Sequence, residues 1–373
     1  MRRIRIVLAI LLLAAASLAG SPTATAAPPG FGPPVHLAAG CVPVSGAADA
    51  TIAADGTVRG YVTCGTSQSP IIWFFRYQGG TVFTQPTPYH GLVVKAAWDG
   101  LASTYLVFSR PGTATPSYQL VLGKRLDNTG GYAPTTLLTT TYPAGLKKHL
   151  PPIQAGLTAY HGQWWSIWTE PVGGVGGEPA YSLFQRHTLL GAEPRTRMTY
   201  PTGQTQDYAP SLAYWHGLMT VVWLRDIFGT GRGTLTLGQT TGHGWTARRL
   251  PGSSPILDPI GYPDLIAYVN IRHLAWLGAT SVGVGMNVTQ FFIPRRFLFQ
   301  APQVATVAVS GFNLFVFWSG TQGAELTERE AANWTVPTHI DGARTAVRVL
   351  AQGGRARLIY WADDGLLTLR EQN

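Results

Sequence analysis

Short apolar runs that end in an aromatic residue recur along the whole chain. In the stretch SLAYWHGLMTVVWLRD, residues 211–226, one alternating run leads to a His-Gly pair and a second run leads to Trp223. Alternation of apolar and polar positions is typical of β-strands, whereas helical repeats would show a period of 3.6 residues. Comparable runs end at seven places along the chain: Trp73, Phe108, Trp168, Trp223, Trp276, Phe317 with Trp318, and Trp361.

The spacing of these runs predicts the architecture. The 288 residues from Trp73 to Trp361 form six intervals with a mean of 48 residues, which is typical of β-propeller blades. Further strands follow the aromatic run, as in GTLTLGQ and GWTARRLPG, so each copy predicts one four-stranded blade. A glycine, which supplies the positive φ of a tight hairpin, separates the first two runs in several copies: Gly162, Gly217, Gly311 and Gly353.

The two ends of the chain complement each other in this pattern. The last copy, residues 345–373, contains three strands, and the open edge of its sheet needs a partner. The segment PPVHLAAGCVPVSG, residues 33–46, precedes the first copy and could donate that strand. The sequence therefore predicts an all-β fold with a single β-propeller of about seven four-stranded blades, closed by an N-terminal strand. Six blades is the alternative, because the copy at Trp73 is irregular.

The first residues predict export. MRRIR is a basic head, IVLAILLLAAASLAG is a short apolar run, and ATAA offers small residues for cleavage near Ala26 or Ala27. We interpret residues 1–26 as a signal peptide, residues 27–40 as a lead segment and residues 41–373 as the propeller domain. A retained N-terminal anchor is the alternative. The predicted location is extracellular, with no membrane span after cleavage.

Cysteine content and charge narrow the class further. Cys41 and Cys64 are the two cysteines, and in an oxidising compartment they predict a structural disulfide. Loss of the basic head would lower the formal net charge from +9 to +6. Nucleic-acid binders concentrate Lys and Arg in a stripe, which this chain lacks, so we expect no nucleic-acid partner. Charged residues make up 12% of the chain, a low content that favours short strands over amphipathic helices.

The repeats resemble those of sialidase-like and lectin-like β-propellers. The similarity lies in P-x-L-A, a hairpin glycine, V-V-W, L-x-L and W-x-x-x-x-L-P, and it covers nearly the whole mature chain. The Asp-box of sialidases, S-x-D-x-G-x-x-W, is degenerate: in TTGHGW, Gly242 stands at the aspartate position and Trp245 follows the glycine directly. A sialidase would further need three arginines, a tyrosine paired with a glutamate, and an aspartic acid. No motif match places these residues, so the resemblance implies the fold more than the activity.

One face of the predicted propeller carries the candidate site. The loops after the second strands and the loops into the first strands emerge together, and we call this end of the ring the loop face. Exposed loops carry charge in any case, so charged residues in these loops are also compatible with a surface that binds no ligand. The candidate catalytic carboxylates are Glu170, Asp226 and Asp264. The candidate ligand-binding residues are Arg110, Arg225, Asp207, Tyr208, Asp258, Tyr262 and Asp363. We expect Arg225 and Asp264 to lie near the channel mouth with partly accessible side chains.

Other conspicuous residues have a structural interpretation. The repeated tryptophans occupy one register of the strands and predict packing between blades rather than sugar platforms. His161 and His216 precede hairpin glycines and predict turn residues rather than metal ligands. No metal or cofactor motif is present, and we expect neither, in a chain that we predict to be monomeric.

Three functions fit these observations. A ligand-binding protein, recognising glycans or another extracellular polymer, fits an aromatic-rich secreted propeller best. An exo-acting glycoside hydrolase of sialidase type, or a related glycosidase or lyase, would use the candidate carboxylates as acid and base. A protein-interaction scaffold would need only a patterned surface. Whether the protein is an enzyme stays open, with binding favoured.

Overall fold

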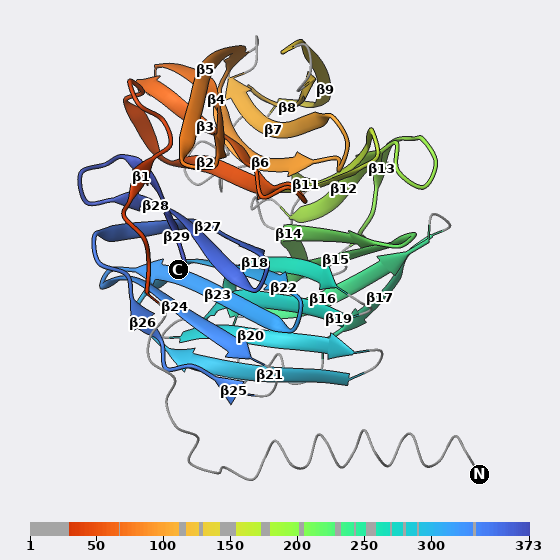
Figure 1. Ribbon diagram of the computed structural model, residues 1–373. Coiled ribbons are helices and arrows are strands. Elements are labelled where there is room, and N and C mark those ends of the chain that lie inside the picture. Colours follow the sequence, from red (N-terminus) through yellow and green to blue (C-terminus); the bar gives the residue numbers. More distant parts are fainter. Residues whose placement is uncertain are drawn as a thin grey trace.

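The protein is a ring of seven small antiparallel sheets (Figure 1). The computed structural model describes residues 30–66, 68–111, 117–126, 130–141, 154–172, 180–200, 205–227, 233–241, 244–250, 259–268, 271–278, 281–288, 291–330 and 333–373, and these contain strands and no helix. We number the sheets as blades 1 to 7 in chain order. The predicted all-β propeller of seven blades is confirmed.

The first four blades follow one another along the chain, each with four strands. Blade 1 consists of β2 (Pro43–Ile52), β3 (Val58–Thr66), β4 (Ser69–Gln78) and β5 (Thr81–His90). Blade 2 consists of β6 (Leu92–Trp98), β7 (Ser103–Pro111), β8 (Ser117–Leu126) and β9 (Tyr132–Thr141). Blade 3 consists of β10 (Ala155–Tyr160), β11 (Gln163–Pro171), β12 (Tyr181–His187) and β13 (Glu193–Arg197). Blade 4 consists of β14 (Thr205–Trp215), β15 (Leu218–Ile227), β16 (Gly233–Thr240) and β17 (Thr246–Arg249).

The last three blades differ in their outer strands. Blade 5 consists of β18 (Pro259–Tyr268), β19 (Ile271–Gly278), β20 (Ser281–Val288) and β21 (Phe291–Leu298). Blade 6 consists of β22 (Pro302–Ser310), β23 (Asn313–Gly320) and β24 (Gly323–Glu330), whose outer edge pairs with the two short strands β25 (Asn333–Trp334) and β26 (Thr338–His339). Blade 7 consists of β27 (Ala343–Gln352), β28 (Arg355–Ala362), β29 (Leu367–Glu371) and the N-terminal β1 (Val35–His36).

The N-terminal strand closes the ring, as the sequence predicts. β1 pairs antiparallel with β29, with Val35 opposite Leu369 and His36 opposite Thr368 (Figure 1). The first strand of each blade lies beside the first strand of the next blade, and β27 lies beside β2. These seven first strands therefore surround the central channel.

The irregular first copy is explained by its register. Trp73 lies in β4, the third strand of blade 1, whereas the aromatic runs of the later blades lie in the second strand. The second strand of blade 1 is β3, which carries Tyr61 and Cys64. The expectation that the run at Trp73 marks a second strand is wrong, although the blade it belongs to is present.

The repeated aromatic residues form the core between blades. Trp168 packs with Tyr105 and Leu120 of blade 2, and Trp276 packs with Leu224 and Leu235 of blade 4. Burying such large apolar surfaces against the neighbouring sheet is what holds one blade to the next. Trp73 is partly buried, whereas the aromatic residues of the six later runs are buried: Phe108, Trp168, Trp223, Trp276, Phe317, Trp318 and Trp361.

The hairpins between first and second strands also follow the prediction. Gly162 and Gly217 have φ values of 80° and 81°, the left-handed region that glycine adopts without strain. His161 and His216 precede them in the same turns at φ values of 48° and 44°. The interpretation of both histidines as turn residues is confirmed. These hairpins emerge at the end of the ring opposite to the loop face, which we call the hairpin face.

A disulfide stabilises the seam between blades 7 and 1. Cys41 and Cys64 are bonded, with their Cα atoms 5.4 Å apart, which confirms the predicted pair. Both cysteines are buried in one cluster with Leu37, Trp361 and other residues of the seam. The bridge fastens the segment between β1 and β2 to the second strand of blade 1.

Some sequence predictions concern residues that the structure does not describe. The predicted signal peptide, residues 1–26, lies outside the described residues, as does Gly242 of the Asp-box remnant. Within the described ranges no helix is long and apolar enough to cross a membrane.

Candidate functional site in the central channel

A ring of polar side chains lines the channel at one level. Each of these residues lies on the first, innermost strand of its blade. The hydrogen bonds described next place them at equivalent positions. We call this set the channel ring: Asp49 on β2, Lys95 on β6, Ser211 on β14, Asp264 on β18, Thr306 on β22 and Arg348 on β27.

Hydrogen bonds between neighbouring innermost strands fix this level. Each bond runs from a backbone N–H to a ring side chain of the preceding blade, and its donor directly follows the ring position of its own blade. The four bonds are Ala96 N–H to Asp49 Oδ2 (2.8 Å), Leu265 N–H to Ser211 Oγ (3.1 Å), Val307 N–H to Asp264 Oδ2 (2.9 Å) and Val349 N–H to Thr306 Oγ1 (3.2 Å). The polar ring thus fastens successive blades to one another.

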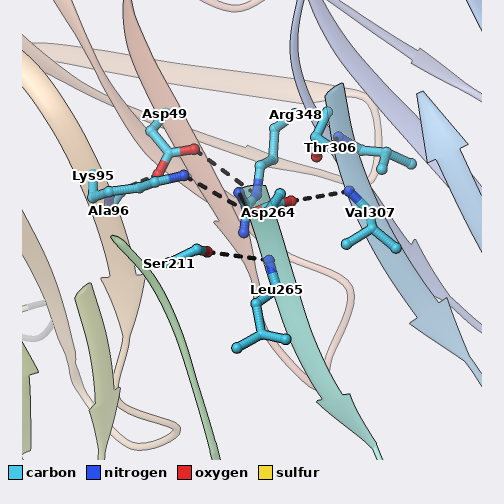
Figure 2. Close-up of polar contacts among 10 residues, drawn as sticks. Asp49, Lys95, Ala96, Ser211, Asp264, Leu265, Thr306, Val307 and Arg348 are labelled. Carbon is cyan, nitrogen blue, oxygen red and sulfur yellow. Dashed lines mark hydrogen bonds and ion pairs between the residues drawn. The ribbon is translucent and has the colours of Figure 1, made fainter. Parts of the chain in front are cut away.

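The charged members of the channel ring also reach beyond their neighbours (Figure 2). Arg348 Nη1 of blade 7 donates to Asp264 Oδ1 of blade 5 at 2.9 Å. Its Nε lies 3.9 Å from Asp49 Oδ1 of blade 1. Lys95 Nζ of blade 2 lies 4.0 Å from the same Asp264 oxygen. These contacts connect four blades, so they span the channel rather than follow its wall.

Burial and charge together set the ionisation of the ring. The side chains of Asp49 and Asp264 are 5% and 7% exposed, whereas those of Lys95 and Arg348 are 28% and 23% exposed. Burial raises the pKa of Asp264, but Arg348 and Lys95 outweigh it and hold that pKa below its usual value. Burial lowers the pKa of Arg348, and Asp264 and Asp49 more than compensate. Arg348 and Lys95 therefore offer partly accessible donors beside an ionised Asp264.

Sequence reasoning found Asp264 and missed the other charged members, Asp49, Lys95 and Arg348. A signal was available, because Lys95 and Arg348 interrupt the otherwise apolar stretches LVVKAAW and AVRVLA. A long cation in the middle of a buried strand needs a partner. The identity of that partner depends on which strands face each other around the ring, which one blade's sequence does not specify.

The predicted residue Glu170 is held within blade 3. Arg195 on β13 binds both carboxylate oxygens, with Nε 2.9 Å from Oε1 and Nη2 in contact with Oε2. Trp168 Nε1 donates to Oε1 at 2.6 Å. Neither Arg195 nor this role of the tryptophan was anticipated. Glu170 is thus a buried, fully engaged carboxylate.

Blade 4 repeats this arrangement with different residues. Arg225 donates to both oxygens of Asp207 at 2.7 and 2.8 Å, and Trp223 Nε1 donates to Asp207 Oδ1 at 3.0 Å. Asp207 is fully buried, while the side chain of Arg225 is 40% exposed. The structure therefore brings two predicted site residues together as a pair, and Arg225 is partly accessible as expected. The expected accessibility of Asp264 is wrong, because this side chain is enclosed by its ion pairs.

The remaining predicted residues are dispersed. Arg110 donates from Nε to Gln119 Oε1 at 2.8 Å, Asp226 is buried, and Asp363 is exposed. Tyr208 is partly buried against the core of blades 4 and 5. Asp258 and the side chain of Tyr262 lie outside the part of the chain that the structure describes.

These contacts limit the chemistry available to the candidate carboxylates. A glycosidase uses one carboxyl group with a raised pKa as general acid and a second carboxylate that is free to act. Asp264 has a lowered pKa, and Glu170 is bound by Arg195. In the described ranges burial raises the pKa of Glu325 and Glu328, but both lie on β24, the third strand of blade 6, rather than on a channel strand.

Comparison with known proteins supports the fold. No known family matches the chain, and no curated protein is significantly similar to it. An α-L-arabinanase from Penicillium chrysogenum, in complex with arabinobiose, is 13% identical, with 81% of this chain and 99% of that chain covered at a TM-score of 0.55. The polysaccharide lyase Uly1 is 10% identical, with 87% and 89% covered at a TM-score of 0.53. At such identities the chain shares a fold with these proteins, and no closer relationship is shown.

Proposed function

We propose that this protein is a secreted glycan-binding propeller whose ligand site lies at the channel ring. The observation that carries the proposal is the ring's composition: fixed carboxylates, partly exposed cations and hydroxyl groups at one level of a central channel. Sugar hydroxyl groups both donate and accept hydrogen bonds. A few precisely oriented polar groups in a concavity are what small-ligand sites use to recognise such groups.

Two further observations agree with this proposal. The Cys41–Cys64 disulfide fits an oxidising, extracellular compartment. The two fold neighbours act on glycans by their names, an arabinanase and a polysaccharide lyase. This second point is an analogy of fold, which raises the prior for a glycan ligand without identifying it.

Binding accounts for the site better than catalysis does. Two of the candidate carboxylates, Glu170 and Asp264, are bound by arginines and accept their hydrogen bonds. A hydrolase or lyase remains the second candidate, because both named neighbours are enzymes. Incubating the purified protein with the glycans it binds, and measuring new reducing ends or unsaturated products, separates the two. Product formation would overturn the binding proposal in favour of catalysis.

A glycan array followed by calorimetry on the best hit tests the proposed site. Lys95→Met removes an accessible charge from the channel and keeps most of the apolar stem. It should weaken binding by about ten-fold to one hundred-fold, since hydrogen bonds to charged groups contribute roughly 1.5–3 kcal/mol. Arg249→Met, on the exposed outer strand β17, removes a cation far from the channel and should leave affinity unchanged. Equal affinities for the two variants, or an array without hits, would refute the proposal.

A further inference from the structure

A pocket on the hairpin face lies between blades 2 and 3, apart from the channel ring. Its volume is about 250 Å³. Blade 2 contributes residues near the end of β8 and the start of β9, and blade 3 contributes the hairpin between β10 and β11. The residues that matter to its chemistry are Tyr105, Lys124, Thr135, Trp164 and Thr188.

The pocket is built on fixed backbone. Tyr105 of blade 2 donates its hydroxyl proton to the Gly162 carbonyl of blade 3 at 2.7 Å. The His161 N–H donates to the Asp99 carbonyl, which ties the hairpins of both blades together. Within blade 3 the Trp164 N–H donates to Thr188 Oγ1 at 3.0 Å. A concavity whose walls are bonded to each other is preformed, so a ligand pays little to organise it.

A carboxylate lies near this pocket but does not pair with its lysine: burial, and after it the charge of Asp99, raise the pKa of Tyr105. Lys124 lies with its Nζ 5.4 Å from the ring centroid of Tyr105, a cation–π contact. Across the described residues no ion pair joins Lys124 to an acidic side chain, in contrast to Lys95 in the channel. The hydroxyls of Thr135 and Thr188 add donors and acceptors. This combination suits an anion that also carries hydroxyl groups.

An exposed aromatic residue lies on the other face of blade 3, toward blade 4. Tyr160 is the cross-strand partner of Gln163, and directly opposed residues point to the same side of a sheet. Its ring is 41% exposed and stacks on His161 at 3.9 Å between centroids. Tyr214 of blade 4 supports it at 5.1 Å. Trp164 packs with blade 2 and directly follows Gln163 on β11, so Tyr160 and Gln163 point away from the pocket, toward blade 4.

We propose that this pocket is a second binding site, specific for an acidic monosaccharide unit, with Lys124 binding the anionic group. Its volume of about 250 Å³ can accommodate one sugar ring. Trp164 forms an apolar wall for the C–H face of the sugar. The inference stands on the geometry of this pocket and holds even if the channel ring binds nothing.

Ligand-observed NMR and calorimetry on the complete protein test this site, with D-glucuronate, glucose 6-sulfate and D-glucose as probes. At least one acidic sugar should bind, and glucose should bind about ten-fold more weakly, because a charge-assisted bond is about twice as strong as a neutral one. Comparing the carboxylate with the sulfate shows which anionic group Lys124 prefers. Equal binding of glucose and both acidic sugars, or binding of none, would overturn the proposal.

Variants locate the binding and separate the two sites. Lys124→Gln should weaken acidic sugars to the level of glucose, Lys124→Arg should retain them, and Arg249→Gln on the outer strand β17 should leave them unchanged. An unchanged affinity in Lys124→Gln refutes the inference. Should Lys124→Gln reduce stability, the Arg variant, which keeps the charge, still provides the test. Loss of acidic-sugar binding in Lys95→Met alone would instead assign it to the channel, so failure of this inference and failure of the proposed function are distinguishable.

Discussion

Asp207 and Asp264 are both buried carboxylates on first strands, and they stabilise different levels of the fold. Asp207 is bound by Arg225, which lies directly opposite it on the neighbouring strand of the same blade. Asp264 is bound by Arg348 two blades further on, and approached by Lys95 from three blades back. The first pair stabilises one sheet. The second network exists only when the ring is closed, so it couples the blades to one another.

The largest effect that this comparison predicts is that of Asp264→Ala. The substitution leaves Arg348 and the Val307 N–H without their acceptor, and removing one partner of a buried ion pair costs about 3–5 kcal/mol. Asp207→Ala should cost less, because Arg225 is 40% exposed and can return to water. Urea unfolding of both variants measures the difference. A greater loss of unfolding free energy in Asp207→Ala would mean that contacts within one blade, and not contacts between blades, limit stability.

The same comparison shows what a sequence can reveal here. The hairpin at Gly217 brings the strands of Asp207 and Arg225 together, so a local pattern predicts that the two residues lie close. A register shift between Tyr208 and Ser211 then sets them directly opposite each other. The Asp264–Arg348 pair depends on how seven sheets close, which no local pattern encodes. The repeated aromatic runs predicted the blades because each run packs on its neighbour. The strand position of the first aromatic run was predicted wrongly for a physical reason. In blade 1 this run forms the third strand, β4, and the second strand, β3, instead carries the disulfide-bonded Cys64.

The next largest effect concerns the covalent closure of the ring. Replacing Cys41 and Cys64 together by serine should lower the free energy of unfolding by about 2–4 kcal/mol, since the bridge restrains a loop of 23 residues in the unfolded chain. Glycan affinity should not change, because neither cysteine belongs to the channel ring. Thermal unfolding with and without reductant measures the effect. An unchanged melting temperature would show that the side-chain contacts of the seam suffice.

Blade 5 should also respond to acid before the channel ring does. Burial, assisted by the nearby Arg329, lowers the pKa of His273 to about 4, below its ordinary value of 6.5. Between pH 6.5 and 4 the imidazole of His273 therefore binds a proton in the unfolded chain but not in the folded protein. The free energy of unfolding falls as the pH drops through this range. The loss amounts to at most about 3 kcal/mol.

Substituting His273 sharpens this prediction. His273→Gln should remove the loss between pH 6.5 and 4 in urea unfolding measured as a function of pH. The acid loss due to Asp264 has the same direction but a lower window. Its pKa is depressed in the folded state, so its contribution is present above the ordinary pKa of an aspartate and disappears only as the pH falls further. If His273→Gln loses as much unfolding free energy above pH 4 as the unmodified protein does, groups other than His273 cause the effect.

The smallest effect is expected for Arg225→Lys. Lysine keeps the charge but cannot donate to both oxygens of Asp207 in the parallel geometry that the guanidinium uses. Since Arg225 is partly exposed, the loss in stability should be about 1 kcal/mol or less. Arg249→Lys, on the outer strand β17, serves as the matched control and should be neutral. Arg225 is also a predicted ligand residue of the loop face, and glycan affinity measured on the same samples tests that role. A stable variant with weakened binding would place Arg225 in the ligand site, whereas a small stability loss with unchanged affinity would confine it to the pair with Asp207 and leave recognition to the channel ring.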